Sequence, residues 1–181
     1  MVFVGSVSAA MPALAANDVC AQPPMAEILP ELVINMRQDI IRAAKTGDME
    51  QMQYVVEQNE VLPIAKFNAA QDANNSPLVA WQAQSQDTDG LYILAQMIEI
   101  LNLGFAKQAL IAGVDLYTWP YFADQDISQL CPTELVDLLT ISSPQAVKQM
   151  QQIRLYTGFQ LAIGSDGSWH YFARKNIVIN K

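Results

Sequence analysis

The fold is decided near the end of the chain, by the stretch Ala162-Ile163-Gly164-Ser165-Asp166-Gly167-Ser168-Trp169-His170-Tyr171-Phe172. The turn signal Ser-Asp-Gly separates two runs of strand-forming residues. The stretch therefore predicts a β-hairpin with strands near Phe159–Gly164 and Trp169–Arg174. It also holds three aromatic residues and the only histidine of the chain. We expect the aromatic side chains of the hairpin to close one end of a hydrophobic core.

The length of the turn decides which side chains face that core, because a slip of one residue exchanges the two faces of a strand. A two-residue Asp-Gly turn sets Ile163 opposite His170 and Leu161 opposite Phe172, and it places His170 on the aliphatic face. A three-residue turn instead sets Ile163 opposite Trp169 and turns Trp169 and Tyr171 towards the helices. It leaves His170, together with Phe172, on the opposite and more accessible face. We favour the three-residue form, because Ser-Asp-Gly suits a type I turn followed by a left-handed glycine.

Upstream of the hairpin the chain is mainly helical. Apolar residues recur at steps of three and four, which predicts helices over Leu29–Lys45 and Leu91–Leu103 with Leu32 and Leu91 facing inward. Asp48 is expected to cap a second helix, and Asp87, Thr88 or Asp89 to cap the helix from Leu91. Shorter helices are predicted over Pro77–Gln84, Phe105–Ala112, Pro132–Thr140 and Pro144–Arg154.

One more strand is expected over Val114–Tyr117, ending before Pro120. The predicted fold class is therefore α+β, a mainly helical domain with a small antiparallel sheet that ends in the C-terminal β-hairpin. Of the 181 residues, 51% are hydrophobic and 15% are charged, which fits one globular domain. We expect this domain to comprise residues 17–181.

Residues 1–16 predict an export signal. The run from Val2 to Ala16 is uncharged and ends in Ala-Leu-Ala-Ala, which suits a signal peptidase. It is too short for a membrane span, which needs about 20 apolar residues. The alternative is an ordinary buried helix, which its glycine, serines and proline disfavour. The interpretation as an export signal predicts a periplasmic or secreted protein.

Cys20 and Cys131 are the two cysteines of the chain. In an oxidising compartment an even number of cysteines favours disulfide pairing, so we expect a Cys20–Cys131 bridge. Two unpaired thiols are the alternative.

The charge balance excludes one class of partner. The formal net charge is −8, from 18 acidic and 10 basic residues. The sequence contains no cluster of Lys or Arg that would bind phosphate backbones, so we expect no nucleic-acid partner.

His170 is the first candidate for catalysis. A general base needs an orienting carboxylate and a nucleophile or substrate within reach, and Asp124 or Glu134 could supply the carboxylate. The chain has no nucleophile signature of the G-x-S-x-G kind. One histidine and two cysteines are too few for a typical metal site, so we expect no metal and no cofactor. A structural or surface role for His170 is therefore favoured over catalysis.

A second aromatic stretch, Tyr117-Thr118-Trp119-Pro120-Tyr121-Phe122, suggests binding. Tryptophan and tyrosine carry polar tips on large flat bodies, which suits sugar stacking or peptide anchoring. The bond before Pro120 is a candidate for the cis form. The alternative is that these aromatics pack as core. The candidate binding surface consists of Trp119, Tyr121, Trp169, His170 and Tyr171.

The two aromatic stretches resemble motifs of an uncharacterised family of exported alphaproteobacterial proteins. The motifs are Leu116-Tyr117-Thr118-Trp119-Pro120-Tyr121-Phe122-Ala123 and the residues from Ile163 to Phe172. That family has no assigned activity, so the resemblance implies export and supplies no catalytic residues. We expect a periplasmic binding or interaction module of the cell envelope, whose partner is an envelope protein, peptide or glycan. The alternative is an envelope hydrolase that uses His170 with a nearby carboxylate.

Overall fold

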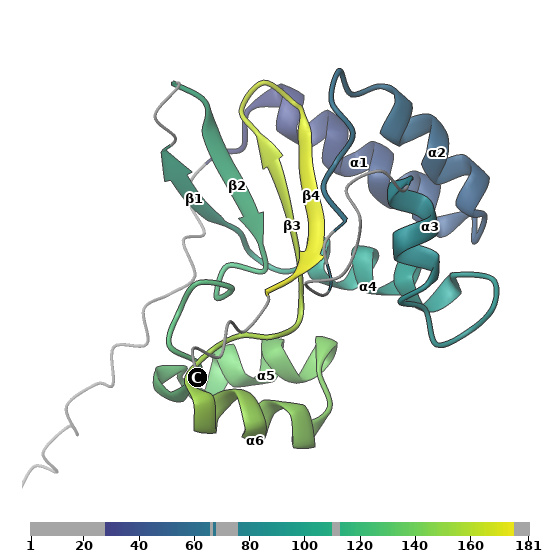
Figure 1. The fold of residues 1–181 in the computed structure, drawn as a ribbon. Coiled ribbons are helices and arrows are strands. Elements are labelled where there is room, and N and C mark those ends of the chain that lie inside the picture. Colours follow the sequence, from purple (N-terminus) through teal and green to yellow (C-terminus); the bar gives the residue numbers. More distant parts are fainter. Residues whose placement is uncertain (1–27, 66, 68–75, 110–112, 176–181) are drawn as a thin grey trace, which may run out of the picture.

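The computed structural model describes residues 28–65, 67, 76–109 and 113–175. These residues form six α-helices and a four-stranded antiparallel sheet, so the fold class is α+β as predicted (Figure 1). The export signal expected at residues 1–16 and the cysteine Cys20 lie outside the described residues. The elements in chain order are α1 (Glu31–Lys45), α2 (Met49–Glu57), α3 (Pro77–Gln82), α4 (Leu91–Asn102), β1 (Ala106–Ala109), β2 (Asp115–Trp119), the 3-10 helix η1 (Ile127–Gln129), α5 (Pro132–Ile141), α6 (Pro144–Ile153), β3 (Phe159–Gly164) and β4 (Trp169–Arg174).

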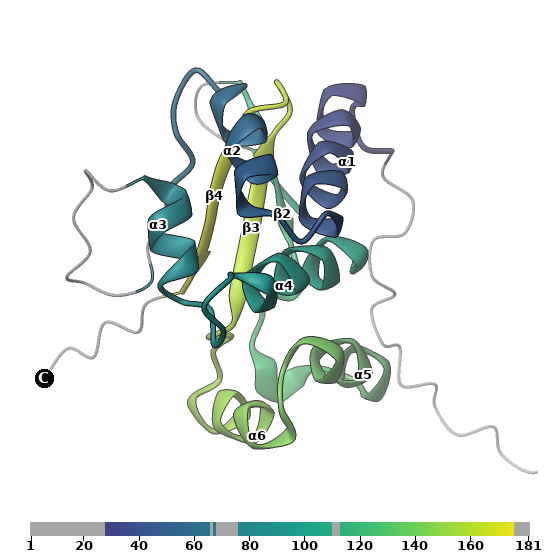
Figure 2. The same cartoon turned by 90° about the vertical axis from the view of Figure 1, so that its right-hand side faces the viewer.

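The sheet has the order β1-β2-β3-β4, and the helices α1 and α4 pack on each other and on β3 (Figure 2). Apolar side chains of both helices are fully buried in this layer, among them Val33, Ile40, Ile93, Met97 and Ile100. The predicted inward positions Leu32 and Leu91 are wrong, because both side chains are exposed. The apolar stripe of each helix extends further round than the part that meets the sheet.

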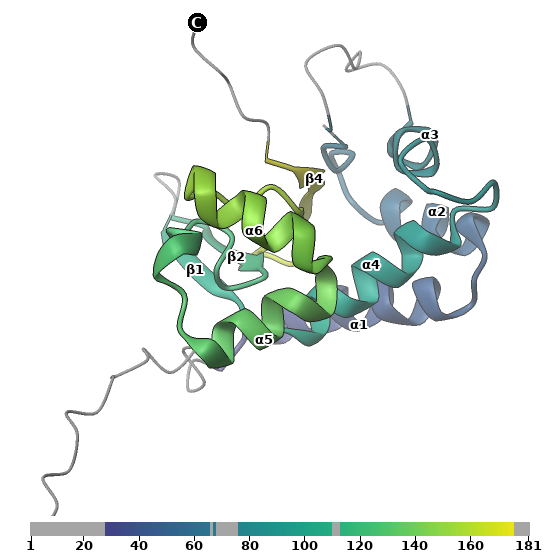
Figure 3. The same ribbon diagram turned by 90° about the horizontal axis from the view of Figure 1, so that it is seen from below.

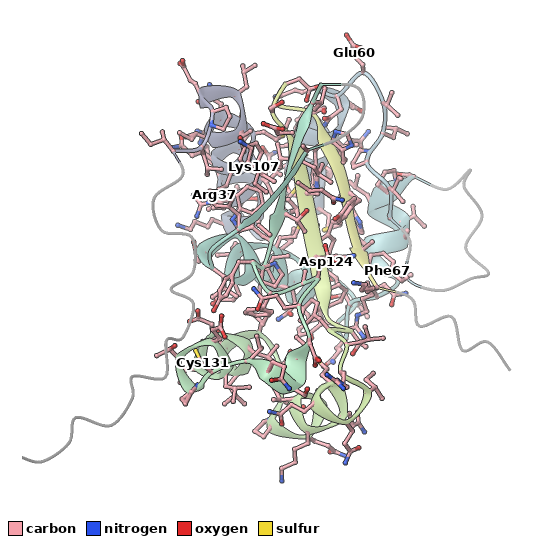
Figure 4. All side chains as sticks on the ribbon, turned by 90° about the vertical axis from the view of Figure 1, so that its left-hand side faces the viewer. Arg37, Glu60, Phe67, Lys107, Asp124 and Cys131 are labelled. Atoms are coloured by element: carbon pink, nitrogen blue, oxygen red, sulfur yellow. The ribbon has the colours of Figure 1, made fainter. Side chains whose placement is uncertain are left out.

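Arg37 connects α1 to α4 through hydrogen bonds. Its Nε and Nη2 atoms donate to the carbonyl oxygen of Leu101 at 2.9 and 2.6 Å, near the C-terminal end of α4 (Figure 4). Carbonyl groups at that end of a helix have no partner within the helix, so a cationic donor there also favours the helix dipole. Partial burial lowers the pKa of the Arg37 guanidinium.

The helix predicted over Phe105–Ala112 is wrong. Ala106–Ala109 form the edge strand β1, which pairs with β2 so that Ala106 lies opposite Thr118. Lys107 Nζ lies 3.2 Å from Asp115 Oδ2 across this pair. The pairing with β2 overrides local helix propensity, because strand formation depends mainly on cross-strand neighbours.

The β3–β4 hairpin contains both of the registers that the sequence left open. Gly167 has φ +85°, and Ile163 lies opposite Trp169, which confirms the three-residue turn. A bulge at His170 then shifts the pairing by one residue, so that Leu161 lies opposite Phe172, as in the two-residue register. Because of this shift Trp169 and Phe172 both reach the helical core, although they are three positions apart. The expectation that Tyr171 faces the helices and Phe172 the opposite side is therefore wrong, since Tyr171 lies opposite Ala162 and outside that core.

The helices α5 and α6 form a separate layer at one end of the sheet, below it in Figure 1 and nearest the viewer in Figure 3. They enclose a second apolar cluster with η1 and the stretch that follows β2. Phe122 and Tyr156 are buried there with ring centroids 5.6 Å apart, and the Tyr156 hydroxyl donates to the carbonyl oxygen of Phe159 at 2.7 Å. The peptide bond between Trp119 and Pro120, where the chain leaves the sheet for this cluster, is cis.

Candidate functional site

A pocket of about 570 Å³ lies beside the turn of the β3–β4 hairpin. Three parts of the chain line it: Met36 of α1, the segment that follows α2, and the turn itself from Asp166 to His170. In Figures 1 and 2 the hairpin turn and the segment after α2 rise to the same end of the molecule, next to α1. The residues after α2 that line the pocket are Gln58, Asn59, Glu60, Val61, Leu62 and Ile64, called the 58–64 segment below.

Three polar side chains from the hairpin converge at this pocket. The Ser168 hydroxyl donates to Asp166 Oδ1 at 2.6 Å and lies 3.0 Å from His170 Nε2. The backbone N–H of Ser168 donates to the same carboxylate oxygen at 3.0 Å. Asp166 and Ser168 lie in the turn between β3 and β4, where an aspartate side chain often accepts from groups two residues further on. We call Asp166, Ser168 and His170 the hairpin polar cluster.

Gly164 makes room for the cluster. A Cβ atom at this position would lie 2.5 Å from Asp166 Oδ1, 2.8 Å from His170 Nε2 and 2.9 Å from Ser168 Oγ. All three distances are shorter than real Cβ contacts, and Gly164 is not one of the glycines with positive φ, so the lack of space is the reason for glycine here. Any side chain at residue 164 would therefore separate the three polar groups.

The hydrogen bonds of the cluster indicate which of its atoms carry protons. The hydrogen bonds from the Ser168 hydroxyl and backbone N–H lower the pKa of Asp166, with a smaller contribution from the charge of His170. Asp166 is thus an ionised acceptor, and the single hydroxyl hydrogen of Ser168 lies in the short bond to it. We assign the remaining contact as His170 Nε2–H donating to Ser168 Oγ.

The 58–64 segment is attached to the hairpin at two points. Asn59 Oδ1 accepts from the backbone N–H of Trp169 at 2.6 Å, while its amide donates to the Val55 and Val56 carbonyls at the end of α2. Further on, Ile64 pairs with β4 through hydrogen bonds to its backbone of 2.9 and 3.1 Å. Backbone hydrogen bonds at Ile64 and the side chain of Asn59 therefore hold the 58–64 segment against the hairpin.

The wall contributed by the 58–64 segment is largely apolar. Val61, Leu62 and Ile64 are 78%, 56% and 60% exposed, which is unusual for three large aliphatic residues so close in sequence. Glu60 precedes them and lies at the hairpin-turn end of the molecule (Figure 4). The pocket therefore combines a polar side, formed by the hairpin, with an exposed aliphatic side.

The aromatic binding surface expected from the sequence does not form. Trp119, Tyr121 and Trp169 are only 1%, 3% and 1% exposed. Trp169 stacks on Trp81 with ring centroids 4.9 Å apart, and the Tyr121 hydroxyl donates to a carboxylate oxygen of Asp137 at 3.0 Å. Their flat apolar bodies are used in the core, which is the alternative that the sequence left open.

The other two predicted surface residues, His170 and Tyr171, are half-buried. His170 lines the pocket. The Tyr171 hydroxyl instead lies 3.4 Å from Thr118 Oγ1 of β2, and burial raises the pKa of its phenol. The five residues proposed as one surface are therefore distributed over the core, the pocket and the sheet.

Neither of the two carboxylates suggested as partners of His170, those of Asp124 and Glu134, forms a hydrogen bond with it. Asp124 accepts from Lys175 Nζ at 2.7 Å and lies well away from the hairpin turn in Figure 4. Glu134 is buried, and its Oε2 accepts from the backbone N–H of Cys131 at the start of α5. The carboxylate that reaches His170, through Ser168, is Asp166. The Asp-x-Ser-x-His spacing is the sequence signal for this arrangement; the sequence pattern assigns Asp166 to the turn and gives Ser168 no role.

Cys131 occupies the N-cap position of α5, with its Sγ atom 3.2 Å from Thr133 Oγ1. Because Cys20 lies outside the described residues, the Cys20–Cys131 disulfide stays a prediction.

No protein family, curated protein or solved structure matches the chain. Within the described ranges no group of three or more His, Cys, Asp or Glu side chains is arranged to hold a metal ion. None of the helices in those ranges has the length and apolar character needed to cross a membrane.

Proposed function

We propose that the protein is a binding module of the cell envelope that takes a small ligand into the pocket beside the β3–β4 turn. The envelope location rests on the predicted export signal and on the resemblance to exported proteins. The observation that carries the binding role is the pocket itself. Its volume of about 570 Å³ lies within the range of roughly 300–1,000 Å³ that is usual for ligand pockets.

The composition of the pocket supports this role. Ligand sites combine an apolar lining with a few converging polar groups, which orient the ligand. Here the apolar lining comes from Met36, Val61 and Leu62, and the orienting groups come from the hairpin polar cluster. The two attachment points of the 58–64 segment hold this arrangement in advance of binding, which reduces the entropic cost of association.

A hydrolase that uses His170 is the second candidate, because Ser168 Oγ lies 3.0 Å from His170 Nε2. In a serine hydrolase the histidine accepts the hydroxyl proton, and the carboxylate orients the histidine from its other nitrogen. In this cluster the carboxylate bonds directly to the serine hydroxyl at 2.6 Å. Ser168 gives its hydrogen to Asp166 and not to His170, so the arrangement favours a polar binding site over an activated nucleophile.

A fragment screen by ¹H–¹⁵N correlation NMR tests the binding role. We expect small molecules that bind to shift the amide signals of Asn59, Val61 and His170. The Gly164→Ala variant should abolish those shifts, because its Cβ displaces the polar cluster, while signals of α5 and α6 keep their positions. Ser168→Ala is the matched control, since it removes one hydroxyl without filling space, and it should weaken binding without preventing it.

Fragments that bind only elsewhere, or that bind Gly164→Ala as well as the wild type, would refute this role. A fluorophosphonate probe tests the second candidate. We expect no labelling of Ser168; labelling that is lost in His170→Ala would establish the hydrolase instead.

A further inference from the structure

We infer that the residues Glu60, Val61 and Leu62 form a strap that closes over a ligand in this pocket. This inference rests on the proposed binding role and specifies how the site encloses what it binds. It follows from the slack of the 58–64 segment between its two attachment points, from the lack of hydrogen bonds between the strap and the rest of the described chain, and from the two aliphatic side chains at the pocket rim.

The 58–64 segment is longer than the part of β4 to which it is attached. At one end the Asn59 side chain accepts from the backbone N–H of Trp169. At the other end Ile64 pairs with Tyr171. At about 3.3–3.6 Å per extended residue, the segment can span roughly 17 Å between these ends, against roughly 7 Å along the strand. The chain between the attachment points therefore arches away from β4, and the arch can change shape while both attachments stay intact.

The strap has few contacts that hold it in one shape. Within the described chain, no hydrogen bond joins the backbone of Glu60, Val61 or Leu62 to another backbone group. The end at Ile64 is fixed by backbone hydrogen bonds of 2.9 and 3.1 Å, and Pro63 before it is buried. Segments with unprotected backbone groups and few buried apolar contacts rearrange at low free-energy cost. We therefore expect movement in the strap and not at its ends.

The aliphatic side chains of the strap lie at the rim of the pocket. Val61 and Leu62 line the pocket yet are 78% and 56% exposed. The lining residues Met36 and Trp169 are buried and form its floor. Closure removes the rim side chains from water, and this favours the closed form when a ligand offers an apolar surface to meet them. Glu60 points outward at this end of the molecule, so its carboxylate stays in water when the strap closes (Figure 4).

A fixed pocket wall is the alternative, and a spin label on the strap distinguishes the two. Glu60→Cys carries a nitroxide in the full-length protein, with labelled wild type as the reference for the native cysteines. The probe is hexanol, which joins an aliphatic body to one polar group. We expect hexanol to broaden the amide signals of Gly167 and Ser168, because closure carries the label towards the hairpin turn. A label at Gln53→Cys, an exposed position on α2, is the matched control and should cause no such change.

Two valine variants test whether the closed strap contacts the probe. Val61→Ser removes an aliphatic chain from the strap. Val79→Ser removes the same chain from α3, where Val79 is 59% exposed and is not among the residues that line the pocket. Val61→Ser should weaken hexanol binding about fivefold, because the closed strap loses apolar contact, and Val79→Ser should leave it unchanged. Both variants should fold normally, since both positions are exposed.

Hexanol that binds at the pocket without broadening Gly167 and Ser168, or that binds Val61→Ser as tightly as wild type, would overturn the strap and leave the binding role intact. Failure of hexanol to shift any pocket amide would also overturn it. The binding role fails separately, if the fragment screen finds no ligand whose shifts depend on Gly164.

Discussion

The contact between the hairpin turn and α1 predicts the effect of Gly167→Ala. Gly167 has φ +85°, a conformation that costs roughly 1–2 kcal/mol for a residue with a side chain. A Cβ atom there would also lie 3.0 Å from Leu32 Cβ and 3.3 Å from the Leu32 carbonyl oxygen. Crowding of this kind adds about 1–3 kcal/mol, because neither atom is the free end of a side chain. We expect a total loss of about 2–5 kcal/mol in the free energy of unfolding.

Gly113→Ala is the matched control. Its φ of +80° is nearly the same, but a Cβ atom there meets no described atom within 4 Å. It should therefore cost only the conformational part, about 1–2 kcal/mol. Urea unfolding of wild type and both variants measures the difference, provided that the m-value is unchanged. Equal losses, or a larger loss for Gly113→Ala, would refute the packing of the turn against α1.

The remaining predictions concern the core, a helix cap and the second cluster. Trp81→Ala removes a fully buried ring that stacks on a second tryptophan, and it should lower the unfolding free energy by about 3–5 kcal/mol in calorimetry or urea titration. The backbone N–H of Tyr92 lowers the pKa of Asp87 well below its usual value, so Asp87 stabilises the fold above pH ~4 and this contribution is lost as the pH falls further. Asp87→Ala should be less stable than wild type at neutral pH, with the difference shrinking in acid; a constant difference would contradict the capping role. Tyr121→Phe keeps the ring but loses the bond to Asp137, and should cost about 1 kcal/mol; no change in stability would show that this bond contributes nothing.

Local patterns in the sequence were sufficient to locate most elements. The strands Phe159–Gly164 and Trp169–Arg174 have the predicted bounds, and Gly167 has the left-handed conformation that a three-residue turn requires. Signals of this kind depend on a few neighbouring residues. The bulge at His170 was not predicted, because it depends on the fit of Trp169 and the residues beyond it to the helical core.

The geometry of the site depends on contacts between residues that are distant in sequence. The hydrogen bond from Trp169 to Asn59 joins residues 110 positions apart, and no local pattern indicates it. Burial explains the error at Trp119, since a large aromatic residue suits a binding surface and a core equally well. Asp166 is visible in the sequence as a turn former, whereas the convergence of Asp166, Ser168 and His170 beside Gly164 depends on the register and the bulge.

The position of the proton on His170 distinguishes a polar binding site from an activated serine nucleophile. In the binding site described above, His170 Nε2 carries the hydrogen and donates it to Ser168 Oγ, and Asp166 accepts the serine hydrogen. Long-range ¹H–¹⁵N NMR of the imidazole, recorded at mildly alkaline pH, distinguishes the two neutral tautomers. We predict the Nε2–H tautomer in the wild type and a loss of this preference in Gly164→Ala. An Nδ1–H tautomer, with Nε2 accepting the serine hydrogen, would contradict the account and favour the hydrolase.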